Sequence, residues 1–195
     1  MTGEPRGFSR VTAVRLATLA GETTRPTSER AKEAIFSMLH LSVQGARVLD
    51  LFAGSGQMAL EALSRGAAHA LLCDSSREAM AVIRSNLEKT RLSPMAEVLC
   101  LDHDACLRRA RPDEPFDLVF LDPPYAKGLI PDALRLLTAR GLLAENATLV
   151  CESAHPDDVF SGDTTLASRF TVLKQVRYGV ACVTLLRYDG EGGAA

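Results

Sequence analysis

The chain has 195 residues, enough for a single domain with a sizeable hydrophobic core. Hydrophobic residues make up 47% of it and charged residues 24%, values that are ordinary for a globular protein. The net charge of −2 argues against a protein whose whole surface is a basic coat for nucleic acid.

The patterns of apolar runs, cysteines and histidines bear on the cellular compartment of the protein and on whether it binds a membrane or a metal. No apolar run reaches the roughly 18 residues of a membrane span, and the first residues lack a signal-peptide core. The five cysteines are scattered without a Cys-x-x-Cys pair, as expected for small buried side chains in a reducing compartment. The four histidines show no metal-ligand spacing. We therefore expect a cytoplasmic protein with no membrane or metal partner, and we take it to be a monomer.

Strands and helices alternate along most of the chain. After a polar N-terminal stretch, a helix is expected to begin at Pro26, where Pro-Thr-Ser marks a helix start. The expected strands cover residues 47–52, 70–74, 96–101, 116–121 and 147–152. The expected helices between them cover residues 57–65, 77–90, 104–110 and 129–139. Residues 170–177 and 180–188 flank Tyr178-Gly179 and are typical of a β-hairpin.

This alternation predicts an α/β fold with a doubly wound, mostly parallel sheet and a C-terminal antiparallel hairpin. We expect an N-terminal extension or hairpin over residues 1–24, the main domain over residues 25–189, and a disordered tail over residues 190–195. The first 35 residues hold six basic and four acidic side chains, which is a weak indication of a basic N-terminal face.

A glycine-rich turn follows the first expected strand. Gly54 and Gly56 have no side chain, so the backbone there can approach a ligand closely. Asp74, at the end of the next strand, can accept hydrogen bonds from ribose hydroxyls. This pattern is typical of a nicotinamide dinucleotide site and also of a site for S-adenosylmethionine. A tight turn that binds nothing is the remaining alternative.

Two further carboxylates favour S-adenosylmethionine. Asp50, just ahead of the glycines, is poorly placed for a pyrophosphate but suits a cationic amino-acid group. Asp104 can accept from an adenine amino group, although a helix N-cap at Asp102 or Asp104 explains the same residues equally well. The expected cofactor-binding residues are Asp50, Phe52, Ala53, Gly54, Gly56, Asp74, Ser75, Asp104, Ala105 and Asp122.

The segment Asp122-Pro123-Pro124-Tyr125 is the most informative part of the chain. It follows the apolar residues 116–121, so Asp122 is expected at the carboxyl end of a buried parallel strand, where open α/β sheets bind ligands. Two prolines stiffen the turn and leave the Pro123 carbonyl able to accept a hydrogen bond. Two acceptors beside the Tyr125 ring suit a planar amine such as a nucleobase. A turn carboxylate beside a core tyrosine is the structural alternative.

These motifs together resemble a known family. Asp-x-Phe-x-Gly-x-Gly at residues 50–56, the acid at 74 and Asp-Pro-Pro-Tyr at 122–125 resemble a Rossmann-like class I S-adenosylmethionine-dependent methyltransferase that methylates amines. Residues 25–36, 60–66, Asn86 and 150–153 narrow the resemblance to the RsmD family, over about residues 25–188. The family usually has a basic, glycine-containing hairpin ahead of Arg-Pro-Thr, and here residues 11–21, which carry little positive charge, replace it. The acid after the second strand is usually Glu in the family and is Asp74 in this chain.

The resemblance implies methyl transfer to the exocyclic N2 amine of a guanine in small-subunit (16S) ribosomal RNA, as free RNA or in an assembling subunit. The implied cofactor is S-adenosylmethionine, and the implied catalytic residues are Asp122, Pro123, Pro124 and Tyr125. As a hypothesis, Asp122 and the Pro123 carbonyl accept hydrogen bonds from the amine and orient its lone pair. Tyr125 would stack on an extruded base.

Three more side chains are candidates for substrate contact. Arg25 and Arg30 can bind phosphates or the cofactor carboxylate, or can simply be solvated at a helix start. Glu152, which ends the fifth strand, can reach the base pocket or can pair with a nearby arginine.

Three alternative functions stay open at this point. The same chemistry can act on DNA adenine, another RNA or a protein amine. A silent protein can bind cofactor or RNA without catalysis, and a nicotinamide oxidoreductase comes last.

Overall fold

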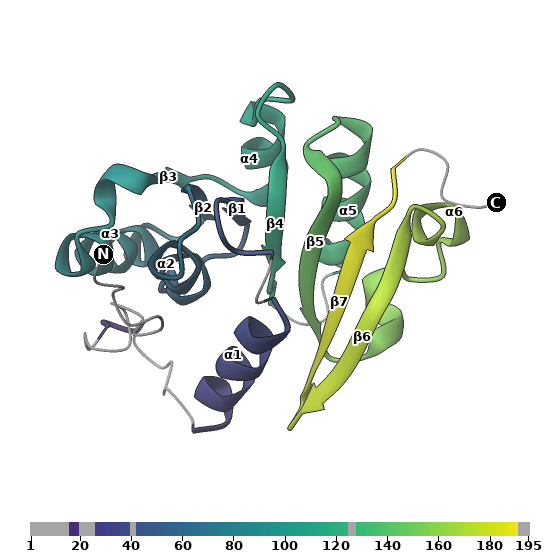
Figure 1. Ribbon diagram of the computed structural model, residues 1–195, viewed down its shortest axis with the longest axis horizontal. Coiled ribbons are helices and arrows are strands. Elements are labelled where there is room, and N and C mark those ends of the chain that lie inside the picture. Colours follow the sequence, from purple (N-terminus) through teal and green to yellow (C-terminus); the bar gives the residue numbers. More distant parts are fainter. Residues whose placement is uncertain (1–15, 20–25, 40–41, 125–127, 191–195) are drawn as a thin grey trace, which may run out of the picture.

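A computed structural model describes residues 16–19, 26–39, 42–124 and 128–190 (Figure 1). Most of the expected N-terminal extension and the tail from residue 191 onward lie outside the described residues. Among the residues that the structure describes, no helix is long and apolar enough to cross a membrane.

One seven-stranded sheet organises the described chain, in the order β3-β2-β1-β4-β5-β7-β6. The first five of these strands run parallel, and β7 is antiparallel to both β5 and β6. This confirms the predicted doubly wound sheet and the C-terminal hairpin. The strands are β1 (Arg47–Asp50), β2 (His69–Asp74), β3 (Ala96–Cys100), β4 (Phe116–Leu121), β5 (Leu143–Ser153), β6 (Phe170–Tyr178) and β7 (Ala181–Tyr188).

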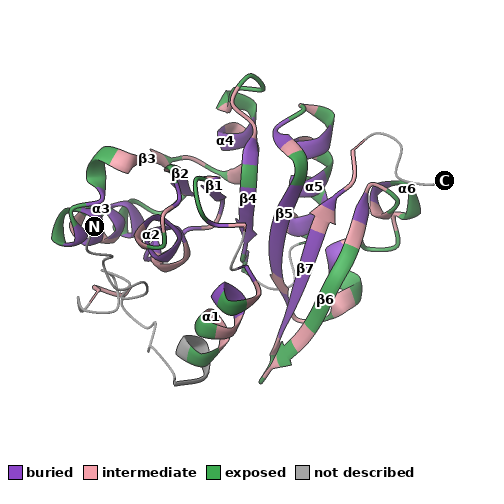
Figure 2. Ribbon diagram, in the orientation of Figure 1, coloured by how far each residue is buried: buried purple, intermediate pink, exposed green. Residues whose placement is uncertain are grey.

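Helices cover both faces of this sheet. One core cluster contains buried residues of α1 (Pro26–Met38), α2 (Gln57–Ser64) and α3 (Arg77–Thr90), and the other contains buried residues of α4 (His103–Arg109), α5 (Leu129–Ala139) and α6 (Thr164–Ala167). Two short 3-10 helices, η1 (Ser93–Met95) and η2 (Pro156–Val159), complete the elements. The central strands β1 and β4 are buried along almost their whole length, as an apolar strand between two helical layers must be (Figure 2).

The ends of two strands differ from the sequence prediction by two residues or more. β1 ends at Asp50 because the chain turns into the glycine-rich segment, where Ala53 N–H donates to the Cys73 carbonyl at 2.9 Å. β5 begins at Leu143, earlier than expected, and passes through Asn146 with φ 59°, beside the point where its pairing with β4 changes register. Because Asn146 is polar and has a positive φ, the pattern of apolar residues does not predict this part of the strand.

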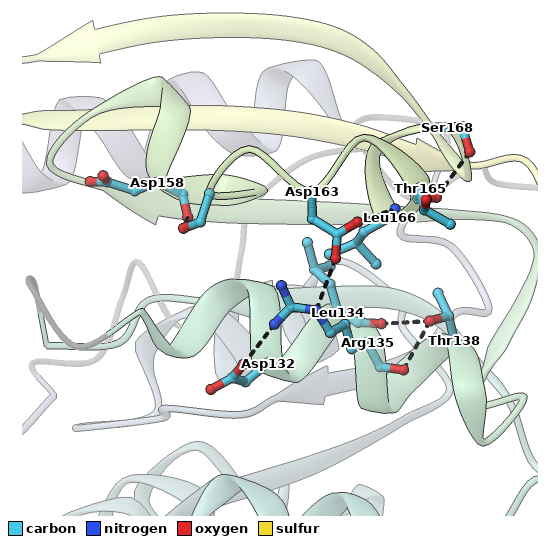
Figure 3. A network of polar contacts seen from close by, with 10 residues as sticks. Asp132, Leu134, Arg135, Thr138, Asp158, Asp163, Thr165, Leu166 and Ser168 are labelled. Atoms are coloured by element: carbon cyan, nitrogen blue, oxygen red, sulfur yellow. Dashed lines mark hydrogen bonds and ion pairs between the residues drawn. The ribbon is translucent and has the colours of Figure 1, made fainter.

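The segment after β5 is fixed to α5 by a small polar network (Figure 3). Arg135 on α5 donates to Asp132 at 2.8 Å and to Asp163 at 3.0 Å. Asp163 also accepts from Leu166 N–H at 2.9 Å and so caps α6. These contacts hold the β5–β6 connection against α5, and this connection forms one side of the site described next.

Candidate active site

The carboxyl ends of all five parallel strands meet at one hollow of about 520 Å³, a size typical of small-molecule sites. Its lining comes from the last residues of β2 and β5, from the segments that follow β1 to β4, and from two more distant leucines. The lining residues are Leu19, Leu51, Phe52, Gly54, Asp74, Ser75, Leu101, Asp102, His103, Asp122, Pro123, Pro124, Leu129 and Glu152. Such a position, at the edge where strand order reverses between β1 and β4, is where open α/β sheets bind ligands.

The glycine turn is held in shape by its own backbone and by Asp74. Gly54 has φ 52°, and its N–H donates to Asp74 Oδ2 at 2.9 Å. Gly56 has φ 78°, and its N–H donates to the Ala53 carbonyl at 2.6 Å. A Cβ at Gly56 would lie 2.9 Å from a Leu60 methyl, so the packing around the turn leaves little space for a side chain there. Gly54 lines the hollow, whereas Gly56 does not appear in its lining.

Asp74 links the turn to the following helix. Besides Gly54 N–H, its carboxylate accepts Ser76 N–H at 2.8 Å through Oδ1, and Ser76 is the N-cap of α3. Each carboxylate oxygen has room for a further hydrogen bond. Asp74 therefore lines the hollow as an acceptor whose position is fixed by the turn.

Asp50 lies beneath the glycine turn and outside the lining of the hollow. Burial raises the pKa of its carboxyl from 3.8 to about 7, while a hydrogen bond from Ala59 N–H lowers the pKa and the nearby Asp74 raises it. The Ala59 N–H donates to Asp50 Oδ2 at 3.2 Å. Ala59 lies in the first turn of α2, and the N-cap residue of this helix, Gly56, has no side chain that could accept such a bond. The structure thus gives Asp50 a capping role for α2.

The segment after β3 contributes a ring and a carboxylate. The rings of Phe52 and His103 lie 5.8 Å apart between centroids at an interplanar angle of 32°, and both line the hollow. Asp102 accepts Ala105 N–H at 2.8 Å, so the N-cap is Asp102, one of the two positions that the sequence left open. Asp104 bonds to Arg108 at 2.7 Å, which lowers the pKa of its carboxyl, and it does not line the hollow.

The turn after β4 separates the large hollow from a smaller one of about 240 Å³. Asp122 is exposed and lines the large hollow, and Pro123 is buried between the two. Residues from the turn, from the start of α5 and from the end of β5 line both: Pro123, Pro124, Leu129 and Glu152. The smaller hollow is completed by Gly128, Ile130, Ser153, Ala154, Asp158 and Ser161.

Two of the predicted site residues, Arg25 and Tyr125, lie outside the described residues. Arg30 is exposed on α1 and lines neither hollow. Ala53 and Ala105 support the site through backbone bonds and do not line it.

Several residues that line the larger hollow were not predicted from the sequence. Asp102 and His103 directly follow the third strand, and the rule that ligands bind at carboxyl ends of strands would have found them. Leu19 has no such signal, because only the tertiary fold brings this residue to the hollow.

The residues present fit a nucleoside cofactor with a cationic group. The hollow offers an aromatic wall, the Asp74 carboxylate and several leucines, and its other charged side chains, Asp102, Asp122 and Glu152, are also acidic. An acidic hollow attracts a cation and disfavours the pyrophosphate of a dinucleotide.

Comparison with known proteins gives the same assignment. YlbH of Bacillus subtilis (strain 168) is 35% identical over 176 residues, which cover 90% of this chain and 94% of that protein. Ribosomal RNA small subunit methyltransferase D of Escherichia coli (strain K12) is 32% identical over 168 residues, 86% of this chain and 81% of that protein. A solved structure of a conserved hypothetical protein from Streptococcus pyogenes is 35% identical, with a TM-score of 0.71 over 84% of this chain and 98% of that one.

A family model described as conserved hypothetical protein 95 matches residues 10–187, nearly the whole chain. The match includes the glycine turn, Asp74 and the turn after β4. The chain therefore belongs to this family, the RsmD family that its motifs resemble.

Proposed function

We propose that this protein transfers a methyl group from S-adenosylmethionine to the exocyclic N2 amine of a guanine in 16S ribosomal RNA. Family membership confirms the predicted enzyme class, an S-adenosylmethionine-dependent methyltransferase, and its cofactor. The name of the Escherichia coli relative supports small-subunit ribosomal RNA as the substrate.

The larger hollow is the proposed cofactor site. Phe52 and His103 would contact the flat adenine ring, and Asp74 would accept hydrogen bonds from the ribose hydroxyls. Gly54 leaves the backbone accessible to the amino-acid part of the cofactor. When bound, S-adenosylmethionine supplies a methyl group that is already activated by a positively charged sulfur.

The smaller hollow is the proposed site for the acceptor base. It shares its wall with the larger hollow at the turn after β4, so a base there would lie beside the cofactor. The N2 lone pair of guanine is delocalised into the ring, so the amine attacks poorly without help. Asp122 and the Pro123 carbonyl would accept its hydrogen bonds, orient the lone pair and stabilise the positive charge that develops on nitrogen. The exposed Asp122 carboxylate can pass the released proton to solvent.

Glu152 is the proposed reader of the base. Guanine carries the N1–H donor beside its N2 amine on the Watson–Crick edge, and the Glu152 carboxylate would accept from N1–H. Adenine has an acceptor at N1, which a carboxylate repels. Glu152 lines both hollows, which supports a role between the proposed cofactor site and the base.

A single observation carries the proposal: Pro123 and Pro124 line two adjoining hollows at the carboxyl edge of the sheet, and Asp122, next to them in the same turn, lines the larger one. A scaffold protein would not need an acidic, proline-stiffened turn at this place.

The proposal is tested with the purified full chain and labelled S-adenosylmethionine. Small ribosomal subunits from cells lacking the gene, naked 16S ribosomal RNA and double-stranded DNA serve as acceptors, and nucleosides are identified by mass spectrometry. We expect N2-methylguanosine in ribosomal RNA and no label in DNA. Label in DNA adenine alone, or in no acceptor while the cofactor binds, would overturn the assignment.

A further inference from the structure

Asn86 on α3 joins three parts of the chain that are far apart in sequence. Its Oδ1 accepts a hydrogen bond from Ala17 N–H at 2.8 Å, and its Nδ2 donates to the Ala17 carbonyl at 2.9 Å. The same Nδ2 donates to the Ser55 carbonyl at 3.0 Å. Both amide hydrogens and the carbonyl oxygen of this fully buried carboxamide are therefore used.

An asparagine is an unusual choice for this face of α3. The other buried residues there are Ala79, Met80, Ile83, Leu87 and Thr90. Among the described residues, the Thr90 hydroxyl donates only to carbonyls of its own helix. A buried carboxamide is tolerated only where its partners are fixed, because an unsatisfied buried polar group is costly. The paired bonds to Ala17 act on the backbone as a neighbouring strand would, and they hold it in one orientation.

Ala17 belongs to residues 16–19, here called the strap. Leu16 and Leu19 pack against the core cluster that contains α1, α2 and α3, and Leu19 also lines the larger hollow. Ser55 lies in the glycine turn, next to Gly54, which lines the same hollow. One buried side chain therefore positions two separate parts of the hollow's wall.

We propose that Asn86 is a positioning residue that couples the strap to the glycine turn, so that the strap retains the cofactor. While Ala17 is held, Leu19 can add an apolar contact to a bound ligand. If Ala17 were free, ordering the chain up to Leu19 on binding would cost conformational entropy, and this cost would offset the contact. Binding in turn stabilises the strap. The inference rests on the proposed function only in taking the larger hollow as the cofactor site.

The test uses the full chain, S-adenosylhomocysteine as the ligand, and the variants Asn86→Ala and Thr90→Val. Thr90→Val is the matched control. Thr90 lies one turn further along the same buried face, and its replacement removes hydrogen bonds to carbonyls of α3. Calorimetric titration gives the dissociation constant, and hydrogen exchange followed by mass spectrometry reports the Ala17 amide directly.

We expect Asn86→Ala to weaken ligand binding about tenfold, which corresponds to about 1.4 kcal/mol, and to remove the exchange protection of Ala17. In methyl transfer, the KM for S-adenosylmethionine should rise by about the same factor, with kcat at saturation changed by less than about threefold. Thr90→Val should leave binding and protection near wild type. In the wild type, the ligand should slow exchange at residues 16–19.

Two results would overturn the inference. One is an Ala17 amide that stays protected in Asn86→Ala, and the other is unchanged ligand affinity once that protection is lost. A wild-type protein that binds no S-adenosylhomocysteine contradicts the proposed function instead, so the two failures are distinguishable.

If Asn86→Ala fails to fold, Leu19→Ala tests the strap without touching the carboxamide. We expect ligand affinity to fall about threefold to fivefold while Ala17 stays protected, since a buried apolar contact is lost and the anchor is kept. Unchanged affinity in this variant would also overturn the inference.

Discussion

The two sides of the carboxyl edge are built by different means. On the cofactor side, polar side chains bind the protein's own backbone: Asp74 holds Gly54, Asp50 holds Ala59, and Asn86 holds Ser55. On the acceptor side, Asp122 is exposed on a turn stiffened by two prolines. The first side obtains its shape from a hydrogen-bonded frame, and the second carries the exposed carboxylate that is proposed to contact the substrate. In the proposed function, binding geometry and chemistry are thus separated between neighbouring strand ends.

The largest effect is expected on the acceptor side. Replacement Asp122→Ala removes the carboxylate that is proposed to orient the amine, so methyl transfer should fall by about 10²–10³-fold. The affinity for S-adenosylhomocysteine should stay within about threefold, because the glycine turn is untouched. Single-turnover transfer and calorimetry measure the two quantities.

Asp117→Ala is the matched control for that variant. Asp117 lies on the same strand, β4, at its opposite end, where it accepts Arg47 N–H at 2.8 Å. Its removal should leave methyl transfer near wild type. Substantial turnover in Asp122→Ala, or an equal loss in both variants, would remove the contrast between the two sides.

The cofactor side is expected to respond to pH through Asp50. The pKa of its buried carboxyl is raised to about 7, so the folded state favours the protonated form. The stability from this group is full below about pH 4 and is lost as pH rises through 7, at about 1.4 kcal/mol per pH unit. In Asp50→Asn this loss should be absent. Urea unfolding of both proteins between pH 4 and 8 measures the difference.

Asp163→Asn serves as a control of opposite sign. The hydrogen bond from Leu166 N–H and the contact with Arg135 lower the pKa of Asp163, so its contribution is present above its unfolded pKa and disappears toward acid pH. This variant should therefore be destabilised near neutrality and not at low pH. If the free energy of unfolding depends on pH in the same way in wild type and Asp50→Asn, the pKa of Asp50 is not raised, and the prediction for Asp50 is wrong.

A smaller effect is expected from Gly56→Ala. Both Gly56 (φ 78°) and Gly141 (φ 63°) have left-handed backbone, but an added Cβ at Gly141 meets nothing within 4 Å. At Gly56 it would lie 2.9 Å from Leu60, 3.1 Å from Leu72 and 3.3 Å from Ile83. The free energy of unfolding should therefore fall by about 1–3 kcal/mol more in Gly56→Ala than in Gly141→Ala.

Equal losses of unfolding free energy in the two glycine variants would mean that backbone strain alone explains why residue 56 is a glycine. A larger loss at Gly56 with unchanged cofactor affinity would support a packing role, as its absence from the lining of the hollow indicates.

The amino-acid sequence by itself determined the order of elements and the main chemical positions. Apolar strand runs, each followed by polar or glycine residues, place Asp74 and Asp122 at strand ends, because parallel strands share one carboxyl edge. The same local logic predicted the hairpin of β6 and β7. Such signals are local in the chain, so they survive without knowledge of the fold.

Only the tertiary structure decided what each polar residue near the site does. The sequence pattern predicted that Asp50 binds a cationic group, and only the structure shows that its buried carboxylate accepts Ala59 N–H and caps α2. The bonds from Asn86 to Ala17 span 69 residues and leave no periodic trace in the sequence. Burial and long-range hydrogen bonds depend on which segments pack together, and that is a property of the folded chain as a whole.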